Sequence, residues 1–361
     1  MKTKGILPFI FSIALLSTAT KAHGQVSVFD FLNLPTSSHA MALGGKNISL
    51  IEDDASLIFH NPALMSSVSD KTLNFNFLTY MQGSKAGNIS FVGAQGERGS
   101  WGAMAQFVGY GNIRETDDMG NVTGSSGALD MNLAGGYSYL LSDRWVGGVH
   151  GKFLYSNYAN YSSIALAVDL GLNYFDEEKD FSFSVVAANL GGQVSAFGET
   201  AESIPMDLQL GISKGLGHLP LRLHLMLYDM FHWSKSYYSP NGNIKGFQLF
   251  ANHLNLGADL TLWQGRMWLG LGYNFRRGFE MKAAGSSHAA GLTVGAGINI
   301  KKVKVGMAYG NYHTGAPTLS FTLAYSFAKE KKALPQTPQR PTSTTDGGTD
   351  PVPNDETPTT D

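Results

Sequence analysis

The segment Ile164–Tyr174, with the sequence IALAVDLGLNY, decides the fold. Every second position carries a large apolar or aromatic side chain, and the positions between them carry alanine, glycine, Asp169 and Asn173. A period of two places these two sets on opposite faces of a β-strand. The segment is also long enough to cross a bilayer when tilted. It therefore indicates a strand with one apolar face and one polar face.

The same alternation recurs along the chain and predicts an all-β fold of fourteen antiparallel strands. A soluble β-sandwich would share the alternation, but its core rarely needs fourteen strands. The number and length of the strands therefore favour a transmembrane barrel, with apolar side chains in lipid and polar ones in the lumen. The expected strands are 71–81, 87–95, 100–110, 128–140, 144–155, 161–175, 181–189, 204–213, 219–228, 249–263, 266–275, 289–300, 303–310 and 318–327.

The connections between these strands alternate in length. Every second connection is short, such as 264–265 and 301–302, whereas the others are usually longer, such as 111–127 and 229–248. Outer-membrane barrels combine short periplasmic turns with long extracellular loops. We therefore expect the outer membrane of a Gram-negative bacterium, with the long loops outside and both termini in the periplasm.

Composition removes several classes of protein. The 361 residues include no cysteine, which excludes a disulfide scaffold, a thiolate metal site, a cysteine nucleophile and an acylated N-terminal cysteine. Lys and Arg number 26 against 28 Asp and Glu, and this balance disfavours nucleic-acid binding. Glycine is abundant at 43 residues, as a curved and crowded wall requires.

The two ends of the chain differ from the barrel. Residues 1–24 combine Lys2 and Lys4 with a short apolar run and a small-residue cleavage site before Gln25, which predicts a signal peptide. Residues 329–361 follow the barrel, 71–328, and hold many prolines, threonines and aspartates. That composition predicts a disordered tail, either an inert extension or a periplasmic contact.

Residues 25–70 do not alternate, and they are too few to form a core of their own. Ser37-Ser38 is expected to cap a short helix that ends at Gly44-Gly45. Asp53-Asp54 is expected to cap a second helix, from Ala55 to His60, which Pro62 interrupts. Apolar positions in this segment are buried if it lies in the lumen, so we predict an N-terminal plug.

The stretch SHAMALGGKNISLIEDDASLIFHNPALM (38–65) resembles the N-terminal region of the PorV/PorQ proteins, relatives of the FadL-type fatty-acid channels. In them, an Asn-Pro-Ala triplet like Asn61, Pro62 and Ala63 marks the plug, together with a pair like Gly44 and Gly45. The resemblance extends to Asn112–Tyr139 and Ile164–Phe175. It implies a component of the type IX secretion machinery that holds a surface partner of the PorZ type, within the complex that attaches cargo to lipopolysaccharide. On the residues alone, Asn61-Pro62 fits a plain helix stop and turn better than a plug motif.

No catalytic motif was found: neither G-x-S-x-G nor H-E-x-x-H occurs, and we expect neither enzyme activity nor a cofactor or metal. The loop 229–248 carries Trp233, Lys235, Tyr237 and Tyr238, residue types that dominate protein interfaces. We predict that this loop docks an extracellular partner, although interfacial aromatic residues past a strand end would look the same.

Two functions fit these observations. The first is a plugged barrel that anchors a secretion and attachment complex, with PorZ-type and other type IX components, membrane lipid and lipopolysaccharide as partners. The second is a FadL-like transporter, in which the plug gates a path for hydrophobic small molecules. Both require the same barrel.

Overall fold

The structure is a computed structural model. It describes residues 28–80, 83–159, 161–197, 201–239, 244–283, 285, 288–313 and 316–328. The predicted signal peptide and the predicted C-terminal tail lie outside the described residues.

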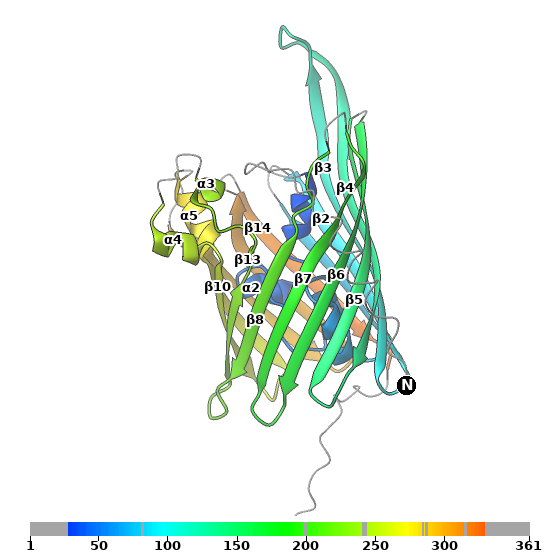
Figure 1. Ribbon diagram of the computed structural model, residues 1–361, viewed down its shortest axis with the longest axis vertical. Helices are drawn as coiled ribbons and strands as arrows, with labels where there is room; N and C mark the ends of the chain where they lie inside the picture. The colour runs from blue at the N-terminus through cyan, green and yellow to red at the C-terminus, as the bar shows by residue number, and fades with distance from the viewer. Residues whose placement is uncertain are drawn as a thin grey trace, which may run out of the picture.

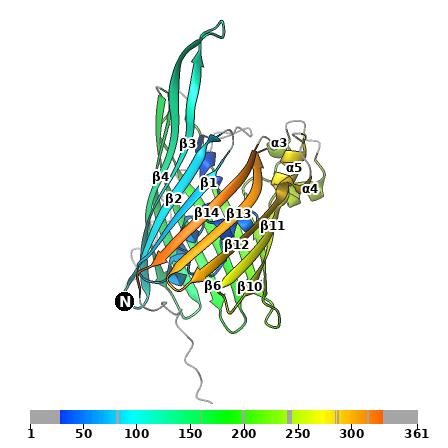
Figure 2. The ribbon, with the colours of Figure 1, turned by 180° about the vertical axis from the view of Figure 1, so that it is seen from behind.

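Fourteen strands form a closed antiparallel barrel in this part of the chain (Figures 1 and 2). Each strand pairs with its neighbours in sequence, and β1 closes the ring by pairing with β14. The predicted fold class is confirmed. The strands are β1 (Thr72–Thr79), β2 (Lys85–Gln95), β3 (Gly99–Thr116), β4 (Val122–Leu140), β5 (Trp145–Tyr158), β6 (Tyr161–Asp176), β7 (Phe181–Ser195), β8 (Asp207–Gly215), β9 (Leu221–Leu227), β10 (Leu254–Leu262), β11 (Met267–Asn274), β12 (Leu292–Ile300), β13 (Val303–His313) and β14 (Ala316–Ser326).

The two faces of the wall differ as the alternation predicts. On β6, Leu166 and Leu170 point outward and are exposed, whereas Asp169 and Asn173 point inward and are buried. Large apolar side chains are exposed in the same way on strands around the ring. A soluble monomer rarely exposes so continuous an apolar surface, so the outer face is the lipid-facing one. Among the described residues, no helix is long and apolar enough to cross a bilayer.

One hairpin is much taller than the rest of the wall. Strands β3 and β4 continue to Thr116 and Val122, well beyond the rim reached by their neighbours (Figure 1). The segment 111–127, expected as a loop, is therefore largely a two-stranded ribbon. Its pairing shifts register between Gly109 and Asn112, where Gly111 has a positive φ of 74°. Both faces of the ribbon are exposed to water, so its sequence lacks the apolar–polar alternation of the strands in the wall.

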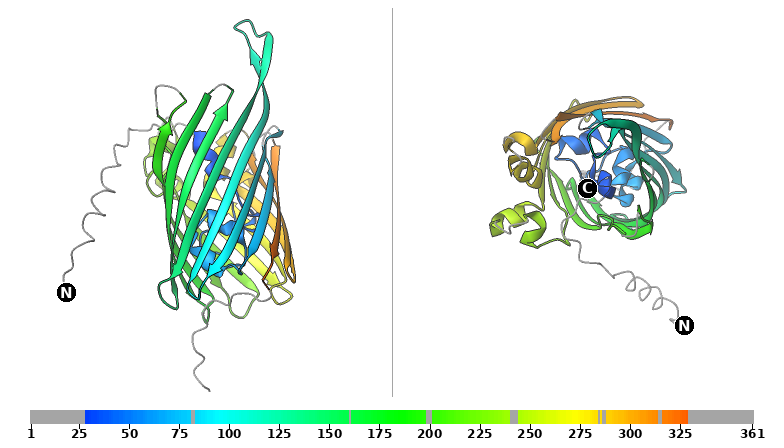
Figure 3. Two further views of the ribbon diagram at one scale, coloured as in Figure 1. Left: turned by 90° about the vertical axis from the view of Figure 1, so that its right-hand side faces the viewer. Right: turned by 90° about the horizontal axis from the view of Figure 1, so that it is seen from above.

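The opposite side of the same rim carries helices. They are α3 (Lys235–Tyr238) and α4 (Gly246–Ala251) between β9 and β10, and α5 (Phe275–Ala283) with the 3₁₀ helix η6 (His288–Gly291) between β11 and β12. Viewed from above, they lie outside the ring of strands (Figure 3). The strand expected over 249–263 was wrong at its start, because residues 249–251 belong to α4. Residue 275 likewise begins α5 rather than ending a strand.

The N-terminal segment lies in the lumen, where Figure 3 shows it in blue within the ring. It contains η2 (Val28–Asn33), α2 (Ser38–Ala42), η3 (Ala55–Phe59) and η4 (Pro62–Ser67). The short helices begin at capping side chains: Ser37 accepts hydrogen bonds from the backbone of α2, and Asp54 from the backbone of η3.

Candidate functional site: the plug and its seat in the lumen

The plug, defined here as residues 28–69, contains a small apolar cluster. Ala40, Leu43, Leu50, Leu57 and Leu64 pack together and are almost completely buried. This cluster joins three turns of the segment that are separated in sequence. The plug is therefore a small folded unit, completed by the barrel around it.

One charged network ties the plug to the strands. The ring of His39 lies between Glu52 of the plug, at 2.6 Å from Nδ1, and Asp259 of β10, at 3.1 Å from Nε2. Arg222 of β9 donates two hydrogen bonds to Asp259, at 3.1 and 2.7 Å. His39 also stacks on Trp268 of β11, with ring centroids 3.9 Å apart.

The plug residues of this network have shifted pKa values. Burial disfavours a charged His39, but the Glu52 and Asp259 carboxylates outweigh it and raise the pKa of His39 to about 9. Burial opposes a charged Glu52 in the same way, yet His39 lowers the pKa of Glu52 to about 2. Both groups are therefore charged at neutral pH, and the pairing of His39 with Asp259 holds α2 against the wall.

Further ion pairs brace the lumen. Lys304 of β13 pairs with Asp53 of the plug at 2.7 Å, and Asp53 also accepts hydrogen bonds from Ser69. Lys152 of β5 pairs with Asp169 of β6 at 2.6 Å and donates to Asn189 of β7. These lumenal carboxylates serve a polar network rather than an acid–base pair.

Glycines in the wall make room for the plug. A Cβ on Gly148 would lie 2.4 Å from the carbonyl carbon of Pro62, and one on Gly171 would lie 2.2 Å from Oδ1 of Asn61. Gly272 approaches Gly44 equally closely, because a Cβ there would lie 2.2 Å from the Gly44 nitrogen. Strands β5, β6 and β11 thus carry glycine, with no side chain, where the plug touches them.

The predicted plug residues lie in this seat. Asn61 accepts a hydrogen bond from the Ala63 nitrogen and donates to the Ile48 carbonyl, so it begins η4, whose first residue is Pro62. The expected helix stop is therefore also a helix start. Gly44 and Gly45 have φ values of 102° and 119°, which other residues rarely adopt.

One cavity beside the plug is small. A cavity of about 20 Å³ lies between the plug and the wall, beside Lys46, His60, Lys152 and Asn189. That volume holds about one water molecule, whereas small-molecule sites usually exceed about 300 Å³. This cavity is therefore too small for an organic ligand.

The residues predicted for partner docking are held by their own neighbours. Trp233 and His253 form a tilted ring pair with centroids 3.9 Å apart, and Tyr237 stacks on His232 with centroids 4.1 Å apart. The Tyr238 hydroxyl donates a hydrogen bond to Asp229. Burial and the Asp229 charge raise the pKa of Tyr238 above its ordinary value. These rings shape the loop, while Lys235 remains exposed.

Trp233 is itself 44% exposed, and other exposed side chains in this region were missed by sequence reasoning. Phe247 and Phe250 on α4 are 74% and 45% exposed, and Phe231 is 54% exposed. The tip of the β3–β4 ribbon presents Met119 at 89%. Phe247 and Phe250, three positions apart, are a pattern typical of one face of an amphipathic helix. The expected strand over 249–263 overlaps this pattern and hides it.

Comparison with known proteins adds information on the fold. No protein-family model matches the chain, and no curated protein matches it. Solved structures do resemble it: the Pseudomonas putida toluene transporter TodX has 12% identity and a TM-score of 0.50, with 83% of this chain and 99% of that chain covered. The CymD monoaromatic hydrocarbon channel has 12% identity and a TM-score of 0.52, with 84% and 99% covered. A Pseudomonas aeruginosa FadL homologue has 13% identity and a TM-score of 0.50, with 81% and 98% covered.

These likenesses define the class of structure. The chain is a plugged, fourteen-stranded outer-membrane-type barrel with a FadL-like fold. Of these neighbours, TodX is named as a toluene transporter and CymD as a monoaromatic hydrocarbon channel.

Proposed function

We propose that this protein is a permanently plugged outer-membrane barrel that anchors a protein partner at the cell surface. The observation that carries this proposal is the fit between the plug and the wall. Glycines on β5, β6 and β11 admit the plug, and the cavity beside Lys46, His60 and Lys152 holds about one water molecule. A gate that moves during each transport event would not require wall glycines that fit the plug so closely.

The long-loop rim supplies surfaces for such a partner. The β3–β4 ribbon stands above the barrel on one side, and α4 presents Phe247 and Phe250 on the other. Exposed aromatic side chains outside the membrane are frequent centres of protein interfaces. Long loops at this rim are expected to face the cell exterior.

The resemblance of residues 38–65 to the PorV/PorQ proteins supports a more specific role. On that basis the partner is a surface protein of the PorZ type, and the complex is the one that attaches type IX cargo to lipopolysaccharide. This part of the proposal rests on the sequence resemblance alone. The structural comparisons favour the second candidate function instead, transport of small hydrophobic molecules, because named neighbours are hydrocarbon channels.

The partner is tested by affinity purification of the tagged protein from detergent-solubilised outer membrane, followed by mass spectrometry. An anchor is expected to co-purify with a large surface protein in near-equal amounts, and its deletion should release cargo from the surface. The double variant Phe247→Ser/Phe250→Ser should reduce recovery of the partner. Purification without any partner, together with normal cargo attachment in the deletion strain, contradicts anchoring.

A disulfide between plug and wall separates anchoring from transport. Ser38 of α2 and Ser320 of β14 have hydroxyl oxygens 2.9 Å apart, and the chain has no other cysteine to interfere. We expect oxidised Ser38→Cys/Ser320→Cys to keep its partner and to leave cargo attachment unchanged. A transporter would lose hydrocarbon uptake on oxidation and regain it on reduction.

The matched control joins two strands and leaves the plug free. Thr72 of β1 donates to Ser326 of β14 at 3.2 Å, so Thr72→Cys/Ser326→Cys staples only the wall. Uptake that falls with the plug staple but not with this wall staple establishes transport through plug movement. Uptake that is absent throughout, with an intact partner complex, supports the anchor.

A further inference from the structure

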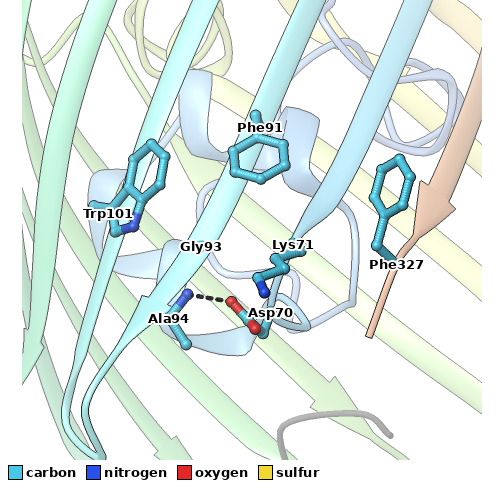
Figure 4. Close-up of a pocket in the computed structure, with 7 residues that line it drawn as sticks. All are labelled: Asp70, Lys71, Phe91, Gly93, Ala94, Trp101 and Phe327. Atoms are coloured by element: carbon cyan, nitrogen blue, oxygen red, sulfur yellow. Dashed lines mark hydrogen bonds between the residues drawn. The ribbon is translucent and has the colours of Figure 1, made fainter. Parts of the chain in front are cut away.

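A groove outside the barrel lies at the short-turn end of β1, β2, β3 and β14. Its volume is about 330 Å³, and it is lined by Asp70, Lys71, Phe91, Gly93, Trp101 and Phe327, with Ala94 beside Asp70. Figure 4 shows Trp101 and Phe91 on one side, Phe327 on the other, and Lys71 and Asp70 between them. The groove opens toward the surroundings of the barrel and not toward the lumen.

A missing side chain creates the groove. Gly93 pairs with Trp101 across β2 and β3, and both positions face outward. A Cβ on Gly93 would lie 2.8 Å from Nε1 of Trp101, so the indole lies across the glycine. On the other side, the Phe327 nitrogen donates to the Lys71 carbonyl at 3.0 Å, which fixes the last aromatic ring of the barrel beside Lys71.

The groove is apolar at one end and charged at the other. Phe91 and Trp101 form a tilted ring pair with centroids 5.5 Å apart, and Trp101 and Phe327 are 43% and 54% exposed. Asp70 and Lys71 lie just before β1, where the wall meets the aqueous side. Aromatic residues of this kind mark the membrane interface, so the gradient in polarity follows the axis of a lipid from acyl chain to headgroup.

The charges indicate the headgroup. Lys71 is exposed, and its ammonium has no hydrogen bond or ion pair with another described residue. One carboxylate oxygen of Asp70 accepts a hydrogen bond from the Ala94 nitrogen at 2.8 Å, which leaves the other oxygen available. A cation and an anion on consecutive residues match a headgroup that carries both charges, whereas a purely anionic headgroup would be repelled by Asp70.

We propose that this groove binds a zwitterionic phospholipid, phosphatidylethanolamine. Lys71 pairs with the phosphate, Asp70 accepts hydrogen bonds from the ammonium, and an acyl chain lies along Phe91, Trp101 and Phe327. With the long loops facing outward, as proposed above, the groove opens to the periplasmic leaflet. That orientation decides only which leaflet the groove faces. The lipid site itself requires neither anchoring nor transport.

The site is tested by native mass spectrometry of the full-length protein released from detergent micelles with added phosphatidylethanolamine or phosphatidylglycerol. The wild type is expected to retain one phosphatidylethanolamine in preference to phosphatidylglycerol. Asp70→Asn and Lys71→Asn should each weaken this binding about two- to fivefold, as the loss of one solvent-accessible ion pair requires. Gly93→Ala should weaken it with all charges in place, because it displaces Trp101.

A matched control uses a second lysine in the same backbone conformation. Lys71 and Lys301 both have a φ of 53°, and Lys301 lies in the turn between β12 and β13, away from the groove. Lys301→Asn should bind lipid as the wild type does, and the heat-induced mobility shift on gels confirms that each variant is folded. If all variants retain both lipids equally, the protein carries only non-specific surrounding lipid, and the proposal is overturned. The proposal is also overturned if Lys301→Asn loses as much lipid binding as Lys71→Asn. It is overturned as well if lipid binds only after residues 329–361 are deleted, since the tail would then be the occupant of the groove.

Discussion

The substitution Gly148→Ala tests whether the wall is shaped around the plug. The new Cβ would lie 2.4 Å from the Pro62 carbonyl carbon and 2.5 Å from the Ala63 nitrogen, about 1 Å short of ordinary contact. Both partners are backbone atoms, so no side chain can rotate away. Overpacking of this kind costs about 1–3 kcal/mol. The population with a displaced plug should therefore rise about five- to 150-fold.

The readout is the labelling rate of a single cysteine in the plug. Ser66 is 4% exposed, and the chain contains no other cysteine, so Ser66→Cys reports displacement of the plug alone. A membrane-impermeant maleimide should label this cysteine faster when Gly148→Ala is present. The rate should follow the increase in the displaced population if opening precedes labelling.

Gly151→Ala is the matched control on the same strand. Gly151 faces outward, and nothing lies within 4 Å of an added Cβ. Its labelling rate should equal that of the parent protein. An unchanged rate in Gly148→Ala, or the same increase in Gly151→Ala, would refute the reasoning that glycine positions on the inner wall define the seat of the plug.

Three further outcomes are expected. The pKa of His39 rises from 6.5 to about 9 on folding, so its charge stabilises the plug below pH 6.5 and this stabilisation is lost as the pH rises through about 9; plug labelling should accelerate there, and His39→Gln should remove that pH dependence. Asn61→Ala leaves a buried N–H and a buried carbonyl without their partner, and a loss of about 1–3 kcal/mol should appear as a lower unfolding temperature. Lys152→Met leaves Asp169 buried without its ion-pair partner and should lower the free energy of unfolding by about 3–5 kcal/mol, measured by urea titration in detergent, whereas an unchanged midpoint would exclude the pairing.

The barrel was predictable because lipid and lumen impose opposite demands on neighbouring residues. On β6, the exposed Leu170 and the buried Asp169 are adjacent in sequence, and that contrast is visible without coordinates. Local capping was equally visible, because Ser37 and Asp54 act on backbone groups two or three residues away. The prediction was less accurate in the β3–β4 ribbon and in α4, which lie outside the lipid-facing wall. Residues there do not alternate between lipid and lumen, so the sequence shows no period of two.

The seat of the plug could not be predicted. His39 meets Asp259, 220 positions further along the chain, and Gly148 gives way to Pro62 on another element. Each partner is unremarkable in its own segment: a histidine in a short helix, or a glycine in a strand. Only the closure of the ring brings them together, and no local pattern in the sequence encodes which strand faces which turn of the plug.

The place of the plug in the chain constrains how the molecule is made. The plug precedes β1, yet Ser38 is hydrogen-bonded to Thr322 and lies against Ser320 on β14, the last strand to be synthesised. The seat of α2 is therefore complete only once β14 has been added. Final docking of the first folded segment is thus coupled to the arrival of the last strand, which also closes the ring with β1.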